Sequence, residues 1–389
     1  MSHYQVTWVG PVLGDNGIGI ASREYVLALH RLGVHVKVTP ARRRSSFSTP
    51  SKRLMLALAR RPLVRKKPTV LVYHRLPHTL NITQARKKYD YLILNAVWET
   101  TKIPRNWLPN INRFDAVCVP SVQNRIAMKR SGVRVPVYIV PHGVDSRAFN
   151  PRNKKLFLKK KGTFLFVSVF TFQHRKNPET LLRAFWEEFS ARDRAALLIK
   201  TSGFSARESG AWIRGRITAY KKKLGIRHKT APLHLLTGST SPRTVRGVYT
   251  AGDAFVLPTR GEGVGLPFLE SLASGTPVIV TGWGGHMDFV TRANSFLVPY
   301  KLKPPAAGMN KAISRSFRRL FVQKGQLWAE PDLGSLKKQM RRAYEHPELC
   351  RQKGLRGRRD MSRWTWTRAG HAMKRAIEKT IASKRRRGG

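Results

Sequence analysis

The chain contains 389 residues, of which 74 are lysine or arginine and 21 are aspartate or glutamate, so its formal net charge is +53. This length allows two domains, each with a hydrophobic core. Its two cysteines, Cys118 and Cys350, lie far apart in sequence and exclude a disulfide framework and a cysteine-based metal motif. No apolar run approaches the roughly 18 residues that a membrane-spanning helix requires.

The excess of cations predicts a polyanionic partner, such as an acidic lipid, a phosphate-rich polymer or a nucleic acid. A strand-like pattern begins within the first residues, so we expect no signal peptide. We therefore expect a cytoplasmic protein, with peripheral attachment to the inner face of the membrane as an open alternative.

The first half of the chain alternates between strand and helix patterns. A glycine-rich loop that includes Gly17 and Gly19 separates the first strand from the first helix. Apolar runs predict strands at residues 4–9, 34–38, 69–73, 91–95 and 116–119, with helical stretches such as residues 123–131 between or after them. This alternation predicts a parallel sheet wound on both faces, and strand–loop–helix is the usual opening of such a domain.

Residues 42–67 differ from their surroundings in composition. An apolar run at residues 54–59 is bracketed by cations, including the triplet Arg42, Arg43 and Arg44, and no acid occurs between Glu24 and Asp90. Such a segment can lie in an anionic membrane interface, where each cation contributes about 1 kcal/mol. It can equally be a solvated basic face over a short core helix, and the sequence leaves both interpretations open.

The second half repeats the alternation. Strands are predicted at residues 163–169, 196–199, 233–236, 253–257 and 278–280, and helices at 208–224, at 328–344 and from 364 through 377. We interpret the cationic residues 151–161 as a linker. The predicted domains are residues 1–150 with the helix at 364–383, and residues 151–363. Residues 384–389 are expected to form a disordered basic tail.

Residues 258–281 carry the strongest chemical signal. A loop with Gly261, Gly263 and Gly265 at alternate positions joins two buried strands through a helix that Pro267 opens and Gly275 closes. The free backbone N–H groups and the positive dipole at such a helix start favour a phosphate. Two carboxylates, Glu262 on the loop and Glu270 on the helix, flank this position.

This combination of Glu-x7-Glu, a glycine-rich loop, a proline at the helix start and Thr276-Pro-Val-Ile resembles the signature of the retaining glycosyltransferases of family 4. The resemblance covers most of the chain and is strongest in residues 160–300. It implies an α/β GT-B fold, in which two doubly wound Rossmann-like domains face a cleft and a C-terminal helix crosses back to the first domain.

The resemblance also implies roles for particular residues. Glu262 would face the reacting carbon of the donor sugar, and Glu270 would hold the ribose hydroxyls. Lys176, aided by Arg175, would contact the nucleotide diphosphate. The residue types suit this chemistry, since a carboxylate accepts hydroxyl hydrogen bonds and stabilises positive charge developing on a sugar ring.

Further candidates follow from the same resemblance. Many family members carry a histidine where this chain has Trp98 and Glu99, so Glu99 is a candidate acceptor-side catalytic residue. The alternative is a loop glutamate paired with a lysine. His74, at the end of a predicted strand, is either an acceptor-side group or a structural histidine. The remaining candidate donor-binding residues are Gly17, Gly19, Thr237, Gly263, Val264, Gly265, Leu266, Gly284 and Gly285.

Together these features predict a hexosyltransferase-type enzyme that moves a sugar from a UDP- or GDP-linked donor to a lipid-linked or polymeric glycan acceptor. No metal or cofactor is required on this interpretation, because cations and helix dipoles supply the electrostatic stabilisation. Two alternatives stay open. One is glycosylation of nucleic acid, which the charge favours although no base-reading motif is present. The other is a catalytically weakened transferase fold that serves as a polyanion-binding structural protein.

Overall fold

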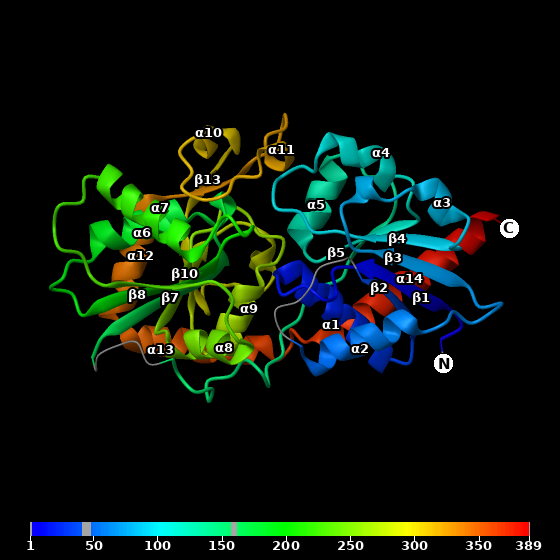
Figure 1. Ribbon diagram of the computed structural model, residues 1–389, viewed down its shortest axis with the longest axis horizontal. Coiled ribbons are helices and arrows are strands. Elements are labelled where there is room, and N and C mark those ends of the chain that lie inside the picture. The colour runs from blue at the N-terminus through cyan, green and yellow to red at the C-terminus, as the bar shows by residue number, and fades with distance from the viewer. Residues whose placement is uncertain (1, 41–47, 157–161, 389) are drawn as a thin grey trace. The chain divides into compact units, whose positions relative to one another are not determined.

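The computed structural model describes residues 2–40, 48–156 and 162–388. The chain forms two compact units, residues 1–143 with 364–389, and residues 144–363. Each unit contains a six-stranded parallel sheet with helices packed on it (Figure 1). The predicted α/β class with two parallel sheets is therefore confirmed.

The sheet of the first unit has the strand order β2-β1-β3-β4-β5-β6. Its strands are β1 (Gln5–Gly10), β2 (His35–Pro40), β3 (Thr69–Tyr73), β4 (Tyr91–Asn95), β5 (Ala116–Val119) and β6 (Val137–Ile139). The chain moves outward from β1 to β2 and then in the opposite direction from β3 to β6. The topological switch point, where ligands usually bind in open α/β sheets, therefore lies between β1 and β3.

The helices of the first unit include the last helix of the chain, α14, which packs along α1 (Figure 1). They are α1 (Gly17–Arg31), α2 (Pro50–Arg60), α3 (Ile82–Arg86), α4 (Leu108–Ile111), α5 (Val122–Arg130) and α14 (Trp366–Gly388). Close packing of α14 on α1 depends on Gly370, because a Cβ atom there would lie 2.5 Å from the Cβ of Ala28.

The prediction of a disordered tail was wrong for residues 384–388, which continue helix α14. Lys384 ties this end to the sheet. Its ammonium donates to the carbonyl of Asp90 at 2.7 Å and lies 3.3 Å from the carboxylate of Asp115. It also lies 5.3 Å from the ring centre of Tyr91. A run of cations is therefore compatible with a helix where an acid and an aromatic ring face it.

The basic segment contains a core helix. Met55 and Leu58 of α2 are buried, and the helix packs against β2. Lys52 is also buried and is paired with Asp15. Leu56 is exposed, and Arg42, Arg43 and Arg44 lie outside the described residues. Within those residues no helix has the length and apolar character needed to cross a membrane. Interfacial attachment stays a prediction.

The sheet of the second unit has the order β12-β11-β10-β7-β8-β9. Its strands are β7 (Phe164–Thr171), β8 (Ala195–Ser202), β9 (Leu233–Thr237), β10 (Ala254–Leu257), β11 (Val278–Thr281) and β12 (Ser295–Val298). From β7 the chain proceeds to β8 and β9 on one side, and from β10 to β11 and β12 on the other. The switch point of this sheet therefore lies between β7 and β10.

Helices cover this sheet, and a two-stranded hairpin follows it. The helices are α6 (Pro178–Glu188), α7 (Gly210–Lys223), α8 (Pro242–Ala251), α9 (Leu266–Ala273), α10 (Ala306–Met309), α11 (Arg318–Phe321), α12 (Leu333–Glu345) and α13 (Pro347–Met361). The antiparallel hairpin consists of β13 (Tyr300–Lys303) and β14 (Trp328–Pro331), with residues 304–327 between its strands.

The prediction of one helix over residues 328–344 was wrong at its start. Trp328–Pro331 forms strand β14, and α12 begins after Asp332, whose carboxylate accepts the N–H of Ser335 at 2.7 Å. The strand pairs with β13, which lies 25 residues or more earlier in the chain. Pro331 disfavours a helical conformation of the residue before it, so the helix begins beyond it.

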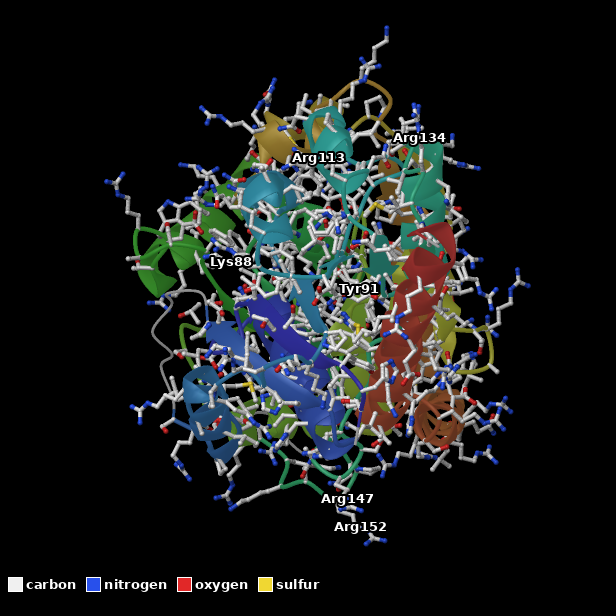
Figure 2. The ribbon with its side chains drawn as sticks, turned by 90° about the vertical axis from the view of Figure 1, so that its right-hand side faces the viewer. Lys88, Tyr91, Arg113, Arg134, Arg147 and Arg152 are labelled. Carbon is white, nitrogen blue, oxygen red and sulfur yellow. The ribbon has the colours of Figure 1, made fainter. Side chains whose placement is uncertain are left out.

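The large cationic excess lies mostly at the surface. Figure 2 labels Lys88, Arg113, Arg134, Arg147 and Arg152, all of which are exposed. Among the described lysine, arginine, aspartate and glutamate residues, six are buried: Arg23, Lys52, Glu179, Glu208, Arg260 and Glu262. Burying a charge is costly unless it is paired. Each of these six residues is therefore a candidate for a structural or functional role.

Helix α13 packs on α9 only because two of its glycines lack side chains. A Cβ atom on Gly354 would lie 2.0 Å from the carbonyl oxygen of Gly275, and one on Gly357 would lie 2.6 Å from Leu272. We expect Gly354→Ala to lower the free energy of unfolding by about 2 kcal/mol, measured by urea denaturation. Gly215→Ala is the matched control on α7, where an added Cβ contacts nothing within 4 Å.

The control substitution should stabilise the protein by up to about 1 kcal/mol, because alanine has the higher helix propensity. Equal effects of the two substitutions on the urea midpoint would contradict this account of the α9–α13 contact.

Candidate functional site

Two loops meet at the carboxyl ends of the adjacent strands β7 and β10. After β7, the short helix η3 (His174–Lys176) leads through Asn177 into α6. After β10, residues 258–265 lead into α9. The two loops are tied by their backbones, since the N–H of Arg260 donates to the carbonyl of Arg175 at 2.8 Å. The switch point of the second sheet thus carries both predicted donor-site segments.

A buried carboxylate and two cations form the centre of this arrangement. The ammonium of Lys176 donates to Oε1 of Glu262 at 2.5 Å, and Nη1 of Arg175 lies 3.4 Å from its Oε2. The hydroxyl of Thr259 also donates to Glu262 Oε1, at 3.1 Å. Only 4% of Glu262 is exposed. The structure therefore brings together three predicted site residues, Glu262, Lys176 and Arg175.

The electrostatics of this trio keep its carboxylate ionised. Burial opposes ionisation of Glu262, but the charges of Lys176 and then Arg175 outweigh it and lower the pKa of Glu262 to about 2. With two cations and one carboxylate, the trio has a formal net charge of +1. Such a group can attract an anion while offering a fixed negative charge beside it.

Glycines allow the loops to approach Glu262. The N–H of Gly285 donates to the carbonyl of Glu262 at 2.7 Å, and a Cβ atom on Gly284 (φ 129°) would lie 3.3 Å from the Glu262 nitrogen. Gly265 has a left-handed backbone (φ 82°), and a side chain there would collide with Phe268. Both glycine turns are thus needed for the backbone geometry around Glu262.

The predicted donor-binding residues that follow Glu262 form the entry to α9. These are Gly263, Val264, Gly265 and Leu266, and all four are buried. Gly265 is the N-cap of α9, and among the described residues no side chain caps this helix. Its first N–H groups and its dipole therefore contribute a positive end beside the trio.

Glu270 lies on α9 and is hydrogen-bonded to Tyr249 of α8. The phenol donates to Glu270 Oε2 at 2.7 Å. Burial raises the pKa of Glu270 to about 7, although the hydrogen bond from Tyr249 acts in the opposite direction. The sequence pattern identified Glu270 but not Tyr249, which lies 21 residues earlier on another helix.

Other predicted residues lie apart from the trio. Thr237 ends β9, which β8 separates from β7, and its hydroxyl accepts from Arg214 at 3.1 Å. Gly17, Gly19 and Glu99 belong to the first unit. There Gly17 and Gly19 start α1, and Glu99 follows β4. Their proposed roles toward a donor or an acceptor stay predictions.

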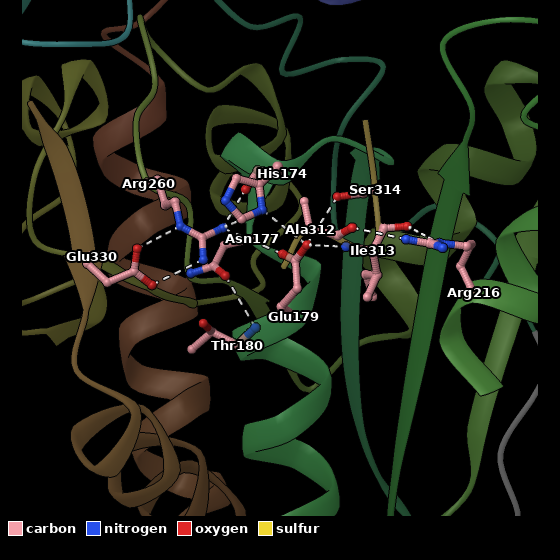
Figure 3. A network of polar contacts seen from close by, with 10 residues as sticks. All are labelled: His174, Asn177, Glu179, Thr180, Arg216, Arg260, Ala312, Ile313, Ser314 and Glu330. Carbon is pink, nitrogen blue, oxygen red and sulfur yellow. Dashed lines mark hydrogen bonds and ion pairs between the residues drawn. The ribbon is translucent and has the colours of Figure 1, made fainter. Parts of the chain in front are cut away.

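Four partners of the site segments were missed by sequence reasoning. Arg260, His174, Glu179 and Glu330 form a network of ion pairs and hydrogen bonds (Figure 3). The sequence offered only a weak signal for Glu179, which lies in the first turn of α6. The helix dipole alone favours a glutamate at such a position. Across the described residues no group of three or more histidine, cysteine, aspartate or glutamate side chains is arranged to hold a metal ion.

Comparison with known proteins gives a family for part of the chain. Residues 161–315 match the model of the family described as glycosyl transferases group 1. An uncharacterized glycosyltransferase from Methanocaldococcus jannaschii is 31% identical over 41% of this chain and 37% of its own length. An alpha-monoglucosyldiacylglycerol synthase from Streptococcus pneumoniae is 27% identical over 44% of this chain and 38% of its own. The chain thus spans well under half of these relatives.

A solved structure resembles nearly the whole chain. Sucrose-phosphate synthase from Thermosynechococcus elongatus matches with a TM-score of 0.67, covering 98% of this chain and 100% of that one at 16% identity. At such low identity the likeness shows the fold alone. The predicted GT-B fold is confirmed by this match together with the two parallel sheets.

The raised pKa of Glu270 predicts a pH-dependent stability. Between pH 4.5 and about 7 the folded state holds a proton that the unfolded chain has released. The contribution of Glu270 to the free energy of unfolding therefore falls as the pH rises through this range. Replacing Glu270 with glutamine removes this term, so the variant should gain stability relative to wild type with rising pH, by up to about 1.4 kcal/mol per pH unit.

Urea denaturation of both proteins at several pH values measures this difference. Glu187→Gln is the control, because ion pairing with Arg183 and Lys337 lowers the pKa of Glu187. Its pH-dependent term therefore lies below pH 4.5, and its difference from wild type should stay constant between pH 4.5 and about 7. Parallel stability curves for wild type and Glu270→Gln would show that this carboxyl has no raised pKa.

Proposed function

We propose that this protein is a retaining glycosyltransferase that moves a sugar from a nucleotide diphosphate donor to a glycan or lipid-linked acceptor. The observation that carries the proposal is the trio of Lys176, Arg175 and the buried Glu262 at the switch point of the second sheet. This trio lies within the segment that matches the group 1 glycosyltransferases. The donor is a UDP- or GDP-linked sugar.

In the proposed reaction the bond between the sugar C1 and the donor phosphate oxygen breaks, and its electron pair stays on that oxygen. The acceptor oxygen forms a bond to C1 on the same face. The acceptor proton passes to the departing phosphate oxygen, so the charges balance. Retention follows because bond breaking and bond making use one face of the sugar.

Each part of the trio suits one change of charge along this path. Lys176 and Arg175 stabilise the negative charge on the departing diphosphate, and the start of α9 adds its dipole. Glu262 stays ionised and stabilises the positive charge that develops on the sugar ring. On this proposal Glu270 binds the ribose hydroxyls, and the residues around Gly265 and Gly284 approach the donor with their backbones.

The proposed acceptor class follows from one relative and from the charge of the chain. The relative from Streptococcus pneumoniae is named alpha-monoglucosyldiacylglycerol synthase, and this name supports a lipid-linked acceptor. The formal charge of +53 supports a polyanionic acceptor or an acidic membrane surface beside it. We therefore propose an acceptor that is presented at such a surface, with the protein attached peripherally from the cytoplasmic side.

A panel of nucleotide sugars, screened by thermal shift and then by isothermal titration, tests donor binding. The cognate donor should raise Tm, since it binds the folded state only. Glu270→Ala should weaken its binding about 10- to 100-fold through loss of two hydroxyl hydrogen bonds. Lys222→Ala, an exposed cation at the end of α7, should bind as wild type does. Wild-type affinity in Glu270→Ala contradicts the ribose role.

Hydrolysis of the donor without acceptor separates an active transferase from a polyanion-binding structural protein. Slow release of sugar should be detectable with the cognate donor in wild type. Lys176→Ala should slow it about 100-fold or more, with a smaller effect on donor affinity, because its charge acts mainly on the departing diphosphate. If no donor of the panel binds or is hydrolysed by wild type, the proposed activity is wrong.

A further inference from the structure

A second charged cluster involves the same two loops as the trio, and Figure 3 shows Arg260 between Glu330 and His174. The guanidinium donates to Glu330 through two nitrogens, Nε at 2.7 Å to Oε2 and Nη2 at 3.1 Å to Oε1. Its third nitrogen, Nη1, donates to the carbonyl of His174 at 2.5 Å and lies 3.5 Å from Glu179. Arg260 thus joins the loop after β10 to strand β14 and to η3.

Glu179 is the other hub of this network. Its carboxylate accepts the N–H of Ile313 at 2.9 Å and the hydroxyl of Ser314 at 3.4 Å, and it lies 3.1 Å from Nδ1 of His174. Burial raises its pKa, but His174 and Arg260 outweigh burial and keep the pKa below its usual value. Residues 304–327, between β13 and β14, are called the excursion below. Glu179 fixes the first turn of α6 to this excursion.

Helix α7 also contacts the excursion. Arg216 of α7 donates to the carbonyls of Ile313 and Ala312, both at 3.0 Å (Figure 3). The backbone of η3 is in turn bonded to the excursion, since the N–H of His174 donates to the carbonyl of Arg315 at 2.9 Å. The turn that carries Lys176 is therefore anchored from two directions.

This anchoring holds a turn that is unfavourable by itself. Asn177, directly after Lys176, has a left-handed backbone with φ 61°. A left-handed backbone is less favourable than a right-handed one for residues other than glycine, although asparagine adopts it more readily than most. Asn177 helps by accepting the N–H of Thr180 at 3.2 Å, and Arg260 holds the start of the same turn through His174.

We propose that Arg260 and Glu179 are positioning residues for the donor diphosphate: they fix the Lys176 turn against the Glu262 loop before the donor binds. This inference rests on the proposed glycosyltransferase function. Arg260 belongs to the loop only two residues before Glu262, while its guanidinium grips the turn two residues before Lys176. One side chain therefore sets the distance between the two loops, and displacement of a charge by about 1 Å can cost a factor of 100 in rate.

A purely stabilising role is the competing explanation. A buried ion network is weak support for stability, because well-packed apolar residues often replace it without loss. Here the network joins the segments that carry the three site charges. Its members come from α6, η3, the loop after β10, β14 and the excursion, so it fixes their relative positions.

Glu179→Gln is the main test variant, because it keeps the shape and removes the charge. Glu187→Gln is the matched control on the same helix, where the carboxylate pairs with Arg183 and Lys337 near the surface. Both variants are assayed well below their Tm with the donor found by the thermal-shift panel. We expect kcat of Glu179→Gln to fall about 10- to 100-fold, with KM changed less, and Glu187→Gln to stay within about twofold of wild type.

Arg260→Lys and Arg260→Gln separate positioning from stability. Lysine restores the positive charge but not the planar fork that reaches Glu330 and His174 together. We expect Arg260→Lys to unfold at a higher urea concentration than Arg260→Gln and yet to show the same loss in kcat. Recovery of kcat in parallel with stability would overturn the positioning role, as would wild-type kcat in folded Glu179→Gln.

The wild-type protein distinguishes the failure of this inference from the failure of the proposed function. If wild type binds no donor and hydrolyses none, the glycosyltransferase proposal itself fails. If wild type is active and the Glu179 and Arg260 variants match it while folded, only the positioning role is wrong.

Discussion

The contact between Lys176 and Glu262 is the interaction on which the candidate site depends. A carboxylate that is 4% exposed would be protonated or driven toward solvent if no cation faced it. Lys176 and Arg175 reverse that tendency, and Glu262 stays ionised in a buried position. The site therefore holds fixed charges of both signs before any ligand arrives. Charges that are already oriented need no rearrangement when a reaction creates new charge beside them.

Sheet topology explains how these residues meet. Lys176 and Glu262 are 86 residues apart, yet β7 and β10 are neighbours because the chain builds one side of the sheet and then returns to build the other. Right-handed crossovers send the two connections to opposite faces. The loops leave adjacent strand ends in different directions, and their side chains turn toward each other. Gly265 and Gly284 allow the backbone turns that keep Glu262 between them.

The sequence was informative where structure is local. Buried parallel strands are continuous apolar runs, so most strands of both sheets could be placed to within one to three residues, and the motif around Glu262 identified the loop and helix correctly. Contacts between residues that are far apart in the sequence could not be predicted. Nothing near Arg260 predicts its bonds to Glu330 and His174, and nothing near Glu270 predicts Tyr249. For the same reason strand β14 was mistaken for helix, since its partner β13 lies far upstream.

Ion pairs are important in this protein because acidic residues are scarce. In a chain with 74 cations and 21 acids, mutual repulsion opposes compact folding, and each carboxylate can neutralise only a few of the surrounding charges. Glu179, Glu262 and Glu330 all face the cations at the ends of β7 and β10. Most other cations are exposed, where water and salt screen them. These three acids therefore lie where screening is weak, and their placement lets a strongly basic protein keep Arg175, Lys176 and Arg260 close together at the carboxyl ends of β7 and β10.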